Sequence, residues 1–151
     1  MGLVRMDNVL LVVEDIEAAI AFFTELGMEL EGRAELQGPW VDGVIGIDGA
    51  HDEVAMMRTP DGHGRIELTR FFTPPAVGPS PGELPTNALG YRRIMFAVDD
   101  LDDTLERLRA HGAEIVRDVV QYEDAYRLCF VRGPEGVLIG LAQPLDAAPP
   151  A

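Results

Sequence analysis

Few residues of this chain could act as nucleophiles or supply a Schiff-base amine. The chain has 151 residues, and all twelve of its basic residues are Arg, so Lys is absent. Ser80 is the single Ser and stands in a Pro- and Gly-rich stretch. Cys129 is the single Cys and lies in an apolar run, which favours an inert buried thiol. Schiff-base, pyridoxal and P-loop chemistry need a Lys amine and are excluded, and no internal disulfide can form.

The three histidines do not favour a metal site of their own. His111 ends a predicted helix beside Gly112, where an imidazole suits the helix dipole. His63 lies in the turn of residues 61–64 and is expected to be exposed. His51 and Asp52 are neighbours at the start of a predicted strand, so their side chains point to opposite faces.

Aromatic side chains offer a different chemistry, the stacking of a flat ligand in a cleft. The candidates are Trp40, Phe71, Phe72, Tyr91, Tyr122 and Tyr126. Ordinary core and interface packing is the alternative for each of them. Arg127 alternates with Cys129 and Val131 on one strand face, where it is either a second cationic pocket residue or simply exposed.

The charge balance excludes two classes of partner. Twelve basic against 26 acidic residues give a net charge of −14, and the isoelectric point is near 4.4. Nucleic acids and anionic membranes both require a basic face, so neither is an expected partner. No stretch approaches the roughly 18 apolar residues of a membrane span, and the N-terminus does not resemble a signal peptide. We expect a soluble cytoplasmic protein.

An internal repeat organises the elements that must position these residues. With a shift of 85 positions, the segment NVLLVVEDIEAAIAFFTELGMEL aligns with RIMFAVDDLDDTLERLRAHGAEI. In each copy a short apolar run, residues 9–13 or 94–98, predicts a buried strand. A helix follows, with Asp15 or Asp100 as its N-cap and Gly27 or Gly112 at its end. The sequence therefore predicts one unit that occurs twice.

Further strands complete each unit as βαβββ. They are expected near residues 28–36, 53–58 and 65–71 in the first copy, and near 113–120, 126–131 and 137–142 in the second. The segment from Trp40 to Ile47 is ambiguous, with helix slightly favoured over strand. We place the modules at residues 1–72 and 90–143. A Pro-rich linker without regular structure joins them at 73–89, and a flexible tail follows at 144–151. The fold class is α+β, with curved sheets around a cleft, which is the usual place for a ligand.

The chain resembles the vicinal oxygen chelate superfamily, which includes glyoxalases, bleomycin resistance proteins and extradiol dioxygenases. The two repeated segments and RLCFVRGPEGVLIGLAQ carry the resemblance, which covers about residues 6–143. It implies paired βαβββ modules and a homodimer. Whether the cleft lies within one chain or between two stays open.

The resemblance also implies four positions at which the metal enzymes of the superfamily hold a divalent ion. They correspond here to Asn8, Glu67, Arg93 and Gly140. Only Glu67 is a good ligand, because Asn8 offers a weak carbonyl oxygen, Arg93 has no lone pair and Gly140 has no side chain. A firmly held metal needs about three or four protein ligands. We therefore expect no metal or other cofactor; Zn, Ni, Mn or Fe is the disfavoured alternative.

Arg93 offers the positive charge that the missing ion would supply. If the modules pack as in the superfamily, Arg93 and Glu67 face one another, and the pair is either structural or holds an anionic or carbonyl-bearing ligand. Glu67 is the one candidate for a catalytic base, although a neighbouring Arg would weaken it. The expected ligand-binding residues are Asn8, Glu67, Arg93, Trp40, Tyr91, Tyr126 and Arg127.

Three functions fit these residues. The first is a metal-independent small-molecule-binding protein that sequesters its ligand. The second is a lyase, isomerase or dioxygenase of the glyoxalase type that uses a divalent metal. The third is a regulatory or assembly module without catalysis, whose cleft is filled by its own side chains.

Overall fold

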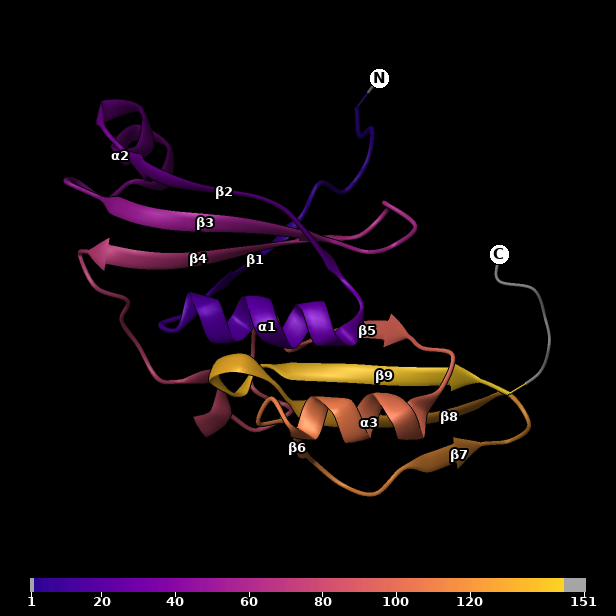
Figure 1. The fold of residues 1–151 in the computed structure, drawn as a ribbon. Helices are drawn as coiled ribbons and strands as arrows, with labels where there is room; N and C mark the ends of the chain where they lie inside the picture. Colours follow the sequence, from indigo (N-terminus) through magenta and orange to yellow (C-terminus); the bar gives the residue numbers. More distant parts are fainter. Residues whose placement is uncertain (1, 146–151) are drawn as a thin grey trace. The chain divides into compact units, whose positions relative to one another are not determined.

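A computed structural model of the chain describes residues 2–145, and its internal contacts divide the chain into two compact units. The first runs to Gly78 and the second begins at Pro79. Each unit contains one twisted sheet with one helix along it, so the α+β class and the doubled βαβββ plan are confirmed (Figure 1).

The first unit contains the strands β1 (Val9–Val12), β2 (Glu29–Gln37), β3 (His51–Arg58) and β4 (Arg65–Thr73). Their order in the sheet is β1-β4-β3-β2, with β1 parallel to β4 and the other pairs antiparallel. Helix α1 (Ile16–Leu26) covers one face of this sheet. We call the opposite face, which α1 does not cover, the open face of the unit.

Helix α1 begins and ends as its sequence predicts. The Asp15 carboxylate accepts a hydrogen bond from the amide of Ala18 at 3.0 Å, and Gly27 ends the helix with φ of 125°. Phe22 and Phe23 are buried on its inner side. The facing strand residues that pack in this core are Ala55, Met57, Ile66 and Leu68, all of them buried.

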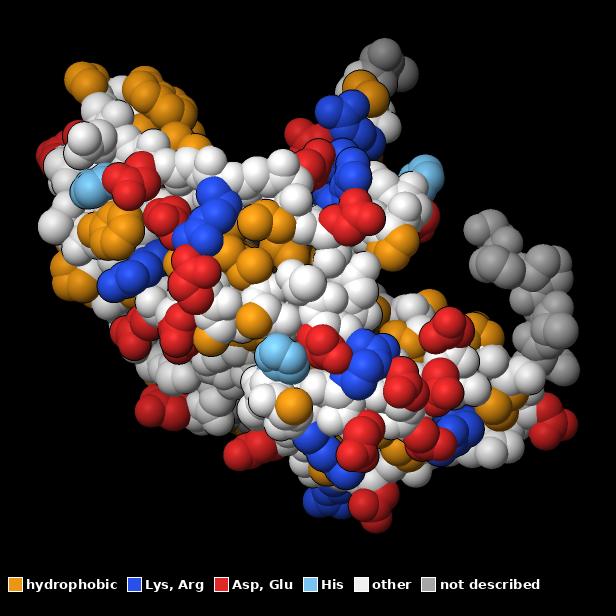
Figure 2. Space-filling model, viewed as in Figure 1, with side chains coloured by type: hydrophobic (Ala, Val, Ile, Leu, Met, Phe, Trp, Pro, Cys, Tyr) orange, Lys and Arg blue, Asp and Glu red, His pale blue; other side chains and the backbone are white. Residues whose placement is uncertain are grey.

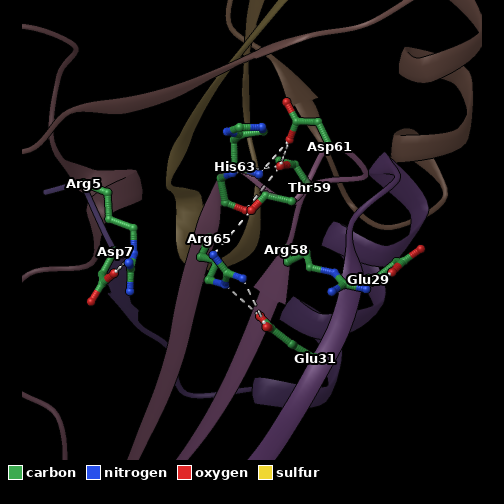
Figure 3. A network of polar contacts seen from close by, with 11 residues as sticks. Arg5, Asp7, Glu29, Glu31, Arg58, Thr59, Asp61, His63 and Arg65 are labelled. Atoms are coloured by element: carbon green, nitrogen blue, oxygen red, sulfur yellow. Dashed lines mark hydrogen bonds and ion pairs between the residues drawn. The ribbon is translucent and has the colours of Figure 1, made fainter.

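The edge strand β2 carries charged side chains that form ion pairs with Arg side chains of β3 and β4. Arg58 binds Glu29 at 2.8 Å, and Arg65 reaches across β3 to Glu31 at 2.9 Å (Figure 3). Both ion pairs lie at the surface and contribute little to stability. Charged side chains on an edge strand discourage pairing with another chain, which is the role we assign to these residues. Figure 2 shows acidic and basic side chains interspersed over the visible face of each unit.

The ambiguous segment after β2 forms a helix, as slightly favoured. Helix α2 spans Pro39–Ile45, with Pro39 in the first turn and Gly46 in the left-handed region at φ of 75°. Val41 is buried, whereas Trp40 and Val44 are exposed.

The second unit contains β5 (Arg93–Ala97), β6 (Glu114–Ile115), β7 (Val120–Tyr122), β8 (Tyr126–Arg132) and β9 (Leu138–Pro144). The sheet order is β5-β9-β8-β6, and β7 also pairs with β8. Helix α3 (Leu101–Arg109) covers one face of this sheet, and we call the opposite face the open face of the second unit. The helix begins at Asp100, whose carboxylate accepts a hydrogen bond from the amide of Asp103. The core between helix and sheet consists of buried residues: Leu101, Leu105, Leu108, Val131, Ile139 and Leu141.

The prediction of one strand at 113–120 is wrong. Ile115 pairs with Val131 and Val120 pairs with Leu128, so the four residues 116–119 stand opposite only two residues of β8. The surplus residues leave the ladder and separate β6 from β7. Alternation of residue types does not reveal such a mismatch, because it depends on the partner strand.

The prediction of a linker without regular structure at 73–89 is also wrong in part. Thr73 belongs to β4, and a 3₁₀ helix, η1, spans Pro81–Glu83. Ser80 Oγ accepts from the amide of Gly82, and the Arg132 guanidinium donates to the carbonyls of Pro81 and Leu84 at 3.1 and 2.8 Å. The segment therefore packs on the second unit. A second 3₁₀ turn, η2 (Pro134–Gly136), connects β8 to β9.

The predicted tail begins too early. Strand β9 continues through Pro144, since Leu128 pairs with Ala142 and Tyr126 with Pro144. Residues 146–151 of the predicted tail lie outside the described residues. None of the described helices, of which the longest has 11 residues, has the length and apolar character needed to cross a bilayer.

Candidate functional site

Glu67 lies on the open face of the first unit. Its neighbours Ile66 and Leu68 are buried against the helix side, so the intervening side chain points the other way. Glu67 pairs with Leu10 of β1 and Met56 of β3, and it is half-buried. Thr69 Oγ1 donates a hydrogen bond to Glu67 Oε2 at 3.0 Å. Asn8 is exposed directly before β1.

A second carboxylate on this open face is Asp52, which sequence reasoning treated only as a neighbour of His51. It is 4% exposed, and its Oδ1 has no hydrogen-bond partner among the described residues. Burial raises the pKa of the Asp52 carboxyl above its ordinary value, and the nearby His51 only partly offsets this. An orphaned buried oxygen of this kind destabilises the folded state when it is ionised.

Arg93 and Gly140 share the open face of the second unit. Strand β9 lies between β5 and β8, and Gly140 is in register with Met95 on one side and Phe130 on the other. Because Gly140 has no side chain, Met95 Sδ packs over it, in the space that a Cβ would occupy. The Arg93 guanidinium lies over the Phe130 ring, 4.5 Å from its centroid.

These residues do not fit a divalent metal. Gly140 contributes no ligand atom and the space above it holds a thioether, while Arg93 places a permanent cation on the same face. Among residues 2–145, no three His, Cys, Asp or Glu side chains are grouped to hold an ion. Glu67 and Arg93 belong to different units, so their ion pair stays a prediction.

A cavity of about 660 Å³ lies in the second unit. Its walls are mostly apolar and come from β7, β8 and the bulged segment before β7: Val116, Val120, Tyr122, Leu128 and Phe130. In the strand register Val120 pairs with Leu128, and Phe130 with Gly140, so these side chains share the open face with Arg93. Tyr122 supplies a phenol among apolar groups.

The rim of this cavity is polar. It is formed by Thr86, from the Pro-rich segment, and by the adjacent residues Arg117 and Asp118. Arg117 and Asp118 stand in the bulge that separates β6 from β7, and both are exposed. The bulge and the Pro-rich segment thus build the site, although neither looked functional in the sequence.

The remaining predicted ligand-binding residues are dispersed. Tyr126 pairs with Tyr122 and lies on the open face of the second unit, whereas Tyr91 is 94% exposed before β5. Trp40 belongs to α2 of the first unit and is 62% exposed. Arg127 lies on the helix side of β8, where it binds both carboxylate oxygens of Asp102 at 3.0 and 3.1 Å.

The other chemically capable side chains are engaged elsewhere. His51 Nε2 lies 3.1 Å from Glu35 Oε2 and its ring is tilted against Phe72. His63 is exposed in its turn, as expected. Cys129 is buried, and burial raises the pKa of its thiol, so it is protonated near neutral pH and a poor nucleophile.

Some of the cavity residues that were not predicted could have been found from the sequence, and others could not. Alternation along β8 puts Leu128 and Phe130 on the face opposite Cys129, so strand periodicity alone could have grouped them. Thr86 gave no signal, because its place depends on hydrogen bonds from Arg132 to the segment before it.

Comparison with known proteins agrees with this architecture. A glyoxalase family protein from Bacillus cereus has 55% identical residues and a TM-score of 0.93, with 97% of each chain covered. A glyoxylase/bleomycin resistance protein/dioxygenase domain from Frankia sp. EAN1pec has 18% identity and a TM-score of 0.64, over 95% of this chain and 99% of that chain. Glyoxalase I from Zea mays has 18% identity and a TM-score of 0.64, over 92% of this chain and 48% of that chain.

At 18% identity the last two likenesses show the fold alone. No curated protein sequence matches the chain. The sequence model of the Glyoxalase/Bleomycin resistance protein/Dioxygenase superfamily, in contrast, matches residues 5–141, nearly the whole chain. With its repeated βαβββ units, the chain belongs to this superfamily.

Proposed function

We propose that this protein binds a small molecule without a metal ion and sequesters it on the open face of its second unit. The observation that carries the proposal is the cavity of about 660 Å³ with apolar and aromatic walls. Ligand pockets commonly have volumes of about 300–1,000 Å³, with mostly apolar walls and a few polar groups that orient the ligand. Tyr122 and Asp118 are such groups.

Binding is favoured over catalysis by the chemistry of the cavity walls. The apolar residues cannot transfer protons, and burial raises the pKa of the thiol of Cys129, which also lines the cavity, so that it stays protonated. Arg117 stays charged at all physiological pH values and cannot act as a base. Because Glu67 belongs to the other unit, a catalytic role for it needs support that the cavity does not supply.

Arg93 and Gly140 support the metal-independent part of the proposal. They stand at positions that correspond to metal ligands in related enzymes, and neither can donate an electron pair from its side chain. We extend the proposal to Glu67 and Asn8, as residues of an Arg- and Glu-lined cleft, and to a cytoplasmic homodimer that needs no cofactor.

The test uses a neutral fluorescent probe, N-phenyl-1-naphthylamine, with the full-length protein in excess EDTA. We expect saturable binding with one site per chain. Val120→Asp should weaken this binding at least about tenfold, since it places a charge in the apolar wall. Val44→Asp, a change of the same kind on exposed helix α2, is the control and should leave binding unaltered.

Two outcomes would contradict the proposal. One is equal binding by both Val→Asp variants, which would place the probe elsewhere. The other is binding or turnover that appears only when stoichiometric Zn, Ni, Mn or Fe is restored, which would favour a metal enzyme.

A further inference from the structure

The Arg93 guanidinium is held in place by an aromatic ring rather than by a carboxylate. It lies 4.5 Å from the centroid of Phe130, and it makes no hydrogen bond or ion pair within the described part of its own unit. A guanidinium has five N–H donors in one plane, and a ring beneath that plane satisfies none of them by hydrogen bonding. Arg93, which is exposed, therefore presents donors on the open face that are not bonded to other side chains or carbonyls of the described part of its unit.

Phe130 connects this cation to the cavity. The same ring forms part of the cavity wall and the platform under the guanidinium. On the strand between them, Arg93 is in register with Leu138 and Phe130 with Gly140, so the guanidinium crosses β9 diagonally to reach the ring. A flat molecule that fills the cavity beside Phe130 would therefore have one edge close to the Arg93 donors.

The open face of the second unit is positively charged along most of its strands, whereas the chain as a whole is negatively charged. On β5, β7, β8 and β9 the charged side chains of the face are Arg93 and Arg132, although the chain carries 26 acidic and 12 basic residues. Arg132 is occupied by the carbonyls of Pro81, Leu84 and Gly136. Nearby carboxylates are confined to the edge, with Glu114 on β6 and Asp118 at the cavity rim.

From these observations we infer that the ligand of the cavity is a planar aromatic carboxylate, with its ring against Phe130, Leu128 and Tyr122 and its carboxylate on the Arg93 donors. The inference rests on the proposed function and names its ligand class. A carboxylate fits the guanidinium fork through two parallel hydrogen bonds. The net charge of −14 repels anions at long range, but salt screens such repulsion beyond about 8 Å at physiological ionic strength.

The experiment compares two probes of the same shape, 2-naphthoate and its neutral analogue 2-naphthamide. Binding of both to the full-length protein is measured by calorimetry in EDTA at pH 7.5. We expect 2-naphthoate to bind at least about tenfold more tightly, as for a charged hydrogen-bonded pair. Arg93→Gln should abolish this preference while leaving the affinity for 2-naphthamide within about twofold.

Arg117→Gln is the matched control, because Arg117 lies at the rim of the same cavity. It should retain most of the preference for 2-naphthoate. The inference is overturned if both probes bind equally well to the wild type, or if Arg117→Gln removes the preference and Arg93→Gln does not. If neither 2-naphthoate, 2-naphthamide nor N-phenyl-1-naphthylamine binds, the proposed function fails as well, and the two failures are thereby distinguished.

Discussion

The two units share a scaffold but differ at equivalent positions of their open faces. In the first unit Glu67 lies between Leu10 and Met56, and in the second Gly140 lies between Met95 and Phe130. The Glu67 carboxylate of the first unit thus corresponds to a position without a side chain, Gly140, in the second. Met95 fills the space above Gly140. At this position the second unit has no oxygen that could bind a metal ion, and the neighbouring Phe130 ring instead supports the Arg93 guanidinium.

The helix sides of the two sheets diverge far less. Asp15 and Asp100 cap their helices in the same way, each accepting from an amide three residues on at 3.0 Å. Leu68 and Leu141, at equivalent positions of the last strand of each unit, are both fully buried. Packing against the helix constrains residue type because the fold depends on it, whereas the open face can change with the ligand.

The largest change in stability is expected in the helix-side cores, which are alike in the two units. Leu68→Ala and Leu141→Ala should each lower the free energy of unfolding by about 3 kcal/mol, because each leaves a cavity in a packed core. Urea unfolding of the two variants measures this. Leu10→Ala on the exposed open face is the control, with a much smaller loss. A loss confined to one of the two core variants would refute the equivalence.

A difference between the units is expected at Arg58 and Arg132, which close β3 and β8. Arg132 is partly buried and donates to three carbonyls, whereas Arg58 makes an exposed ion pair with Glu29. Arg132→Ala should destabilise the protein by about 2 kcal/mol, since it leaves these acceptors unsatisfied.

Arg58→Ala should have only a slight effect that disappears at high salt. Hydrogen–deuterium exchange of residues 81–88 should rise in Arg132→Ala alone. Equal exchange in both variants would show that Arg132 does not hold the Pro-rich segment.

The smallest effect concerns Asp52, whose equivalent in the second unit is the uncharged Tyr126. Burial raises the pKa of Asp52 in the folded chain above its ordinary 3.8. As the pH rises past 3.8, the unfolded chain therefore ionises at this residue first, and the folded state loses stability relative to it. Asp52→Asn should be more stable than the wild type at pH 7 and show no such gain at pH 3.

Exposed Asp48 supplies the control for this pH dependence, since Asp48→Asn should show no difference in its effect between the two pH values. The free energy of unfolding in urea at pH 3 and pH 7 is the readout. A gain for Asp52→Asn that is the same at both pH values would mean that ionisation is not its cause.

Local patterns predicted much of the fold. The structure confirms the predicted apolar strands, the helix caps Asp15 and Asp100, and the slight preference for a helix at Trp40–Ile47. All of these features depend on neighbours in sequence. The split of the strand at 113–120 depends on the register of β8, and η1 depends on Arg132, far along the chain. Such long-range determinants leave no trace in local periodicity.

The same distinction between local patterns and long-range contacts applies to the candidate site. Strand alternation places Glu67 on one open face, and Arg93 with Gly140 on the other. The stacking of Arg93 on Phe130 could not be foreseen, because it requires knowing that β9 lies between β5 and β8 and in which register it pairs with each. The burial of Asp52 and the part of Thr86 in the cavity rim likewise arise from tertiary packing.

The occupant of the cavity in the second unit distinguishes most directly between ligand binding without a metal ion and metal-dependent chemistry. A crystal structure of the protein purified without chelators and grown with 2-naphthoate tests this. We predict that the naphthalene ring lies against Phe130 and Leu128 and that the carboxylate binds Arg93, with no metal ion present. A naphthoate held by a metal ion at Glu67, or an empty cavity with the ligand bound elsewhere, would contradict the account.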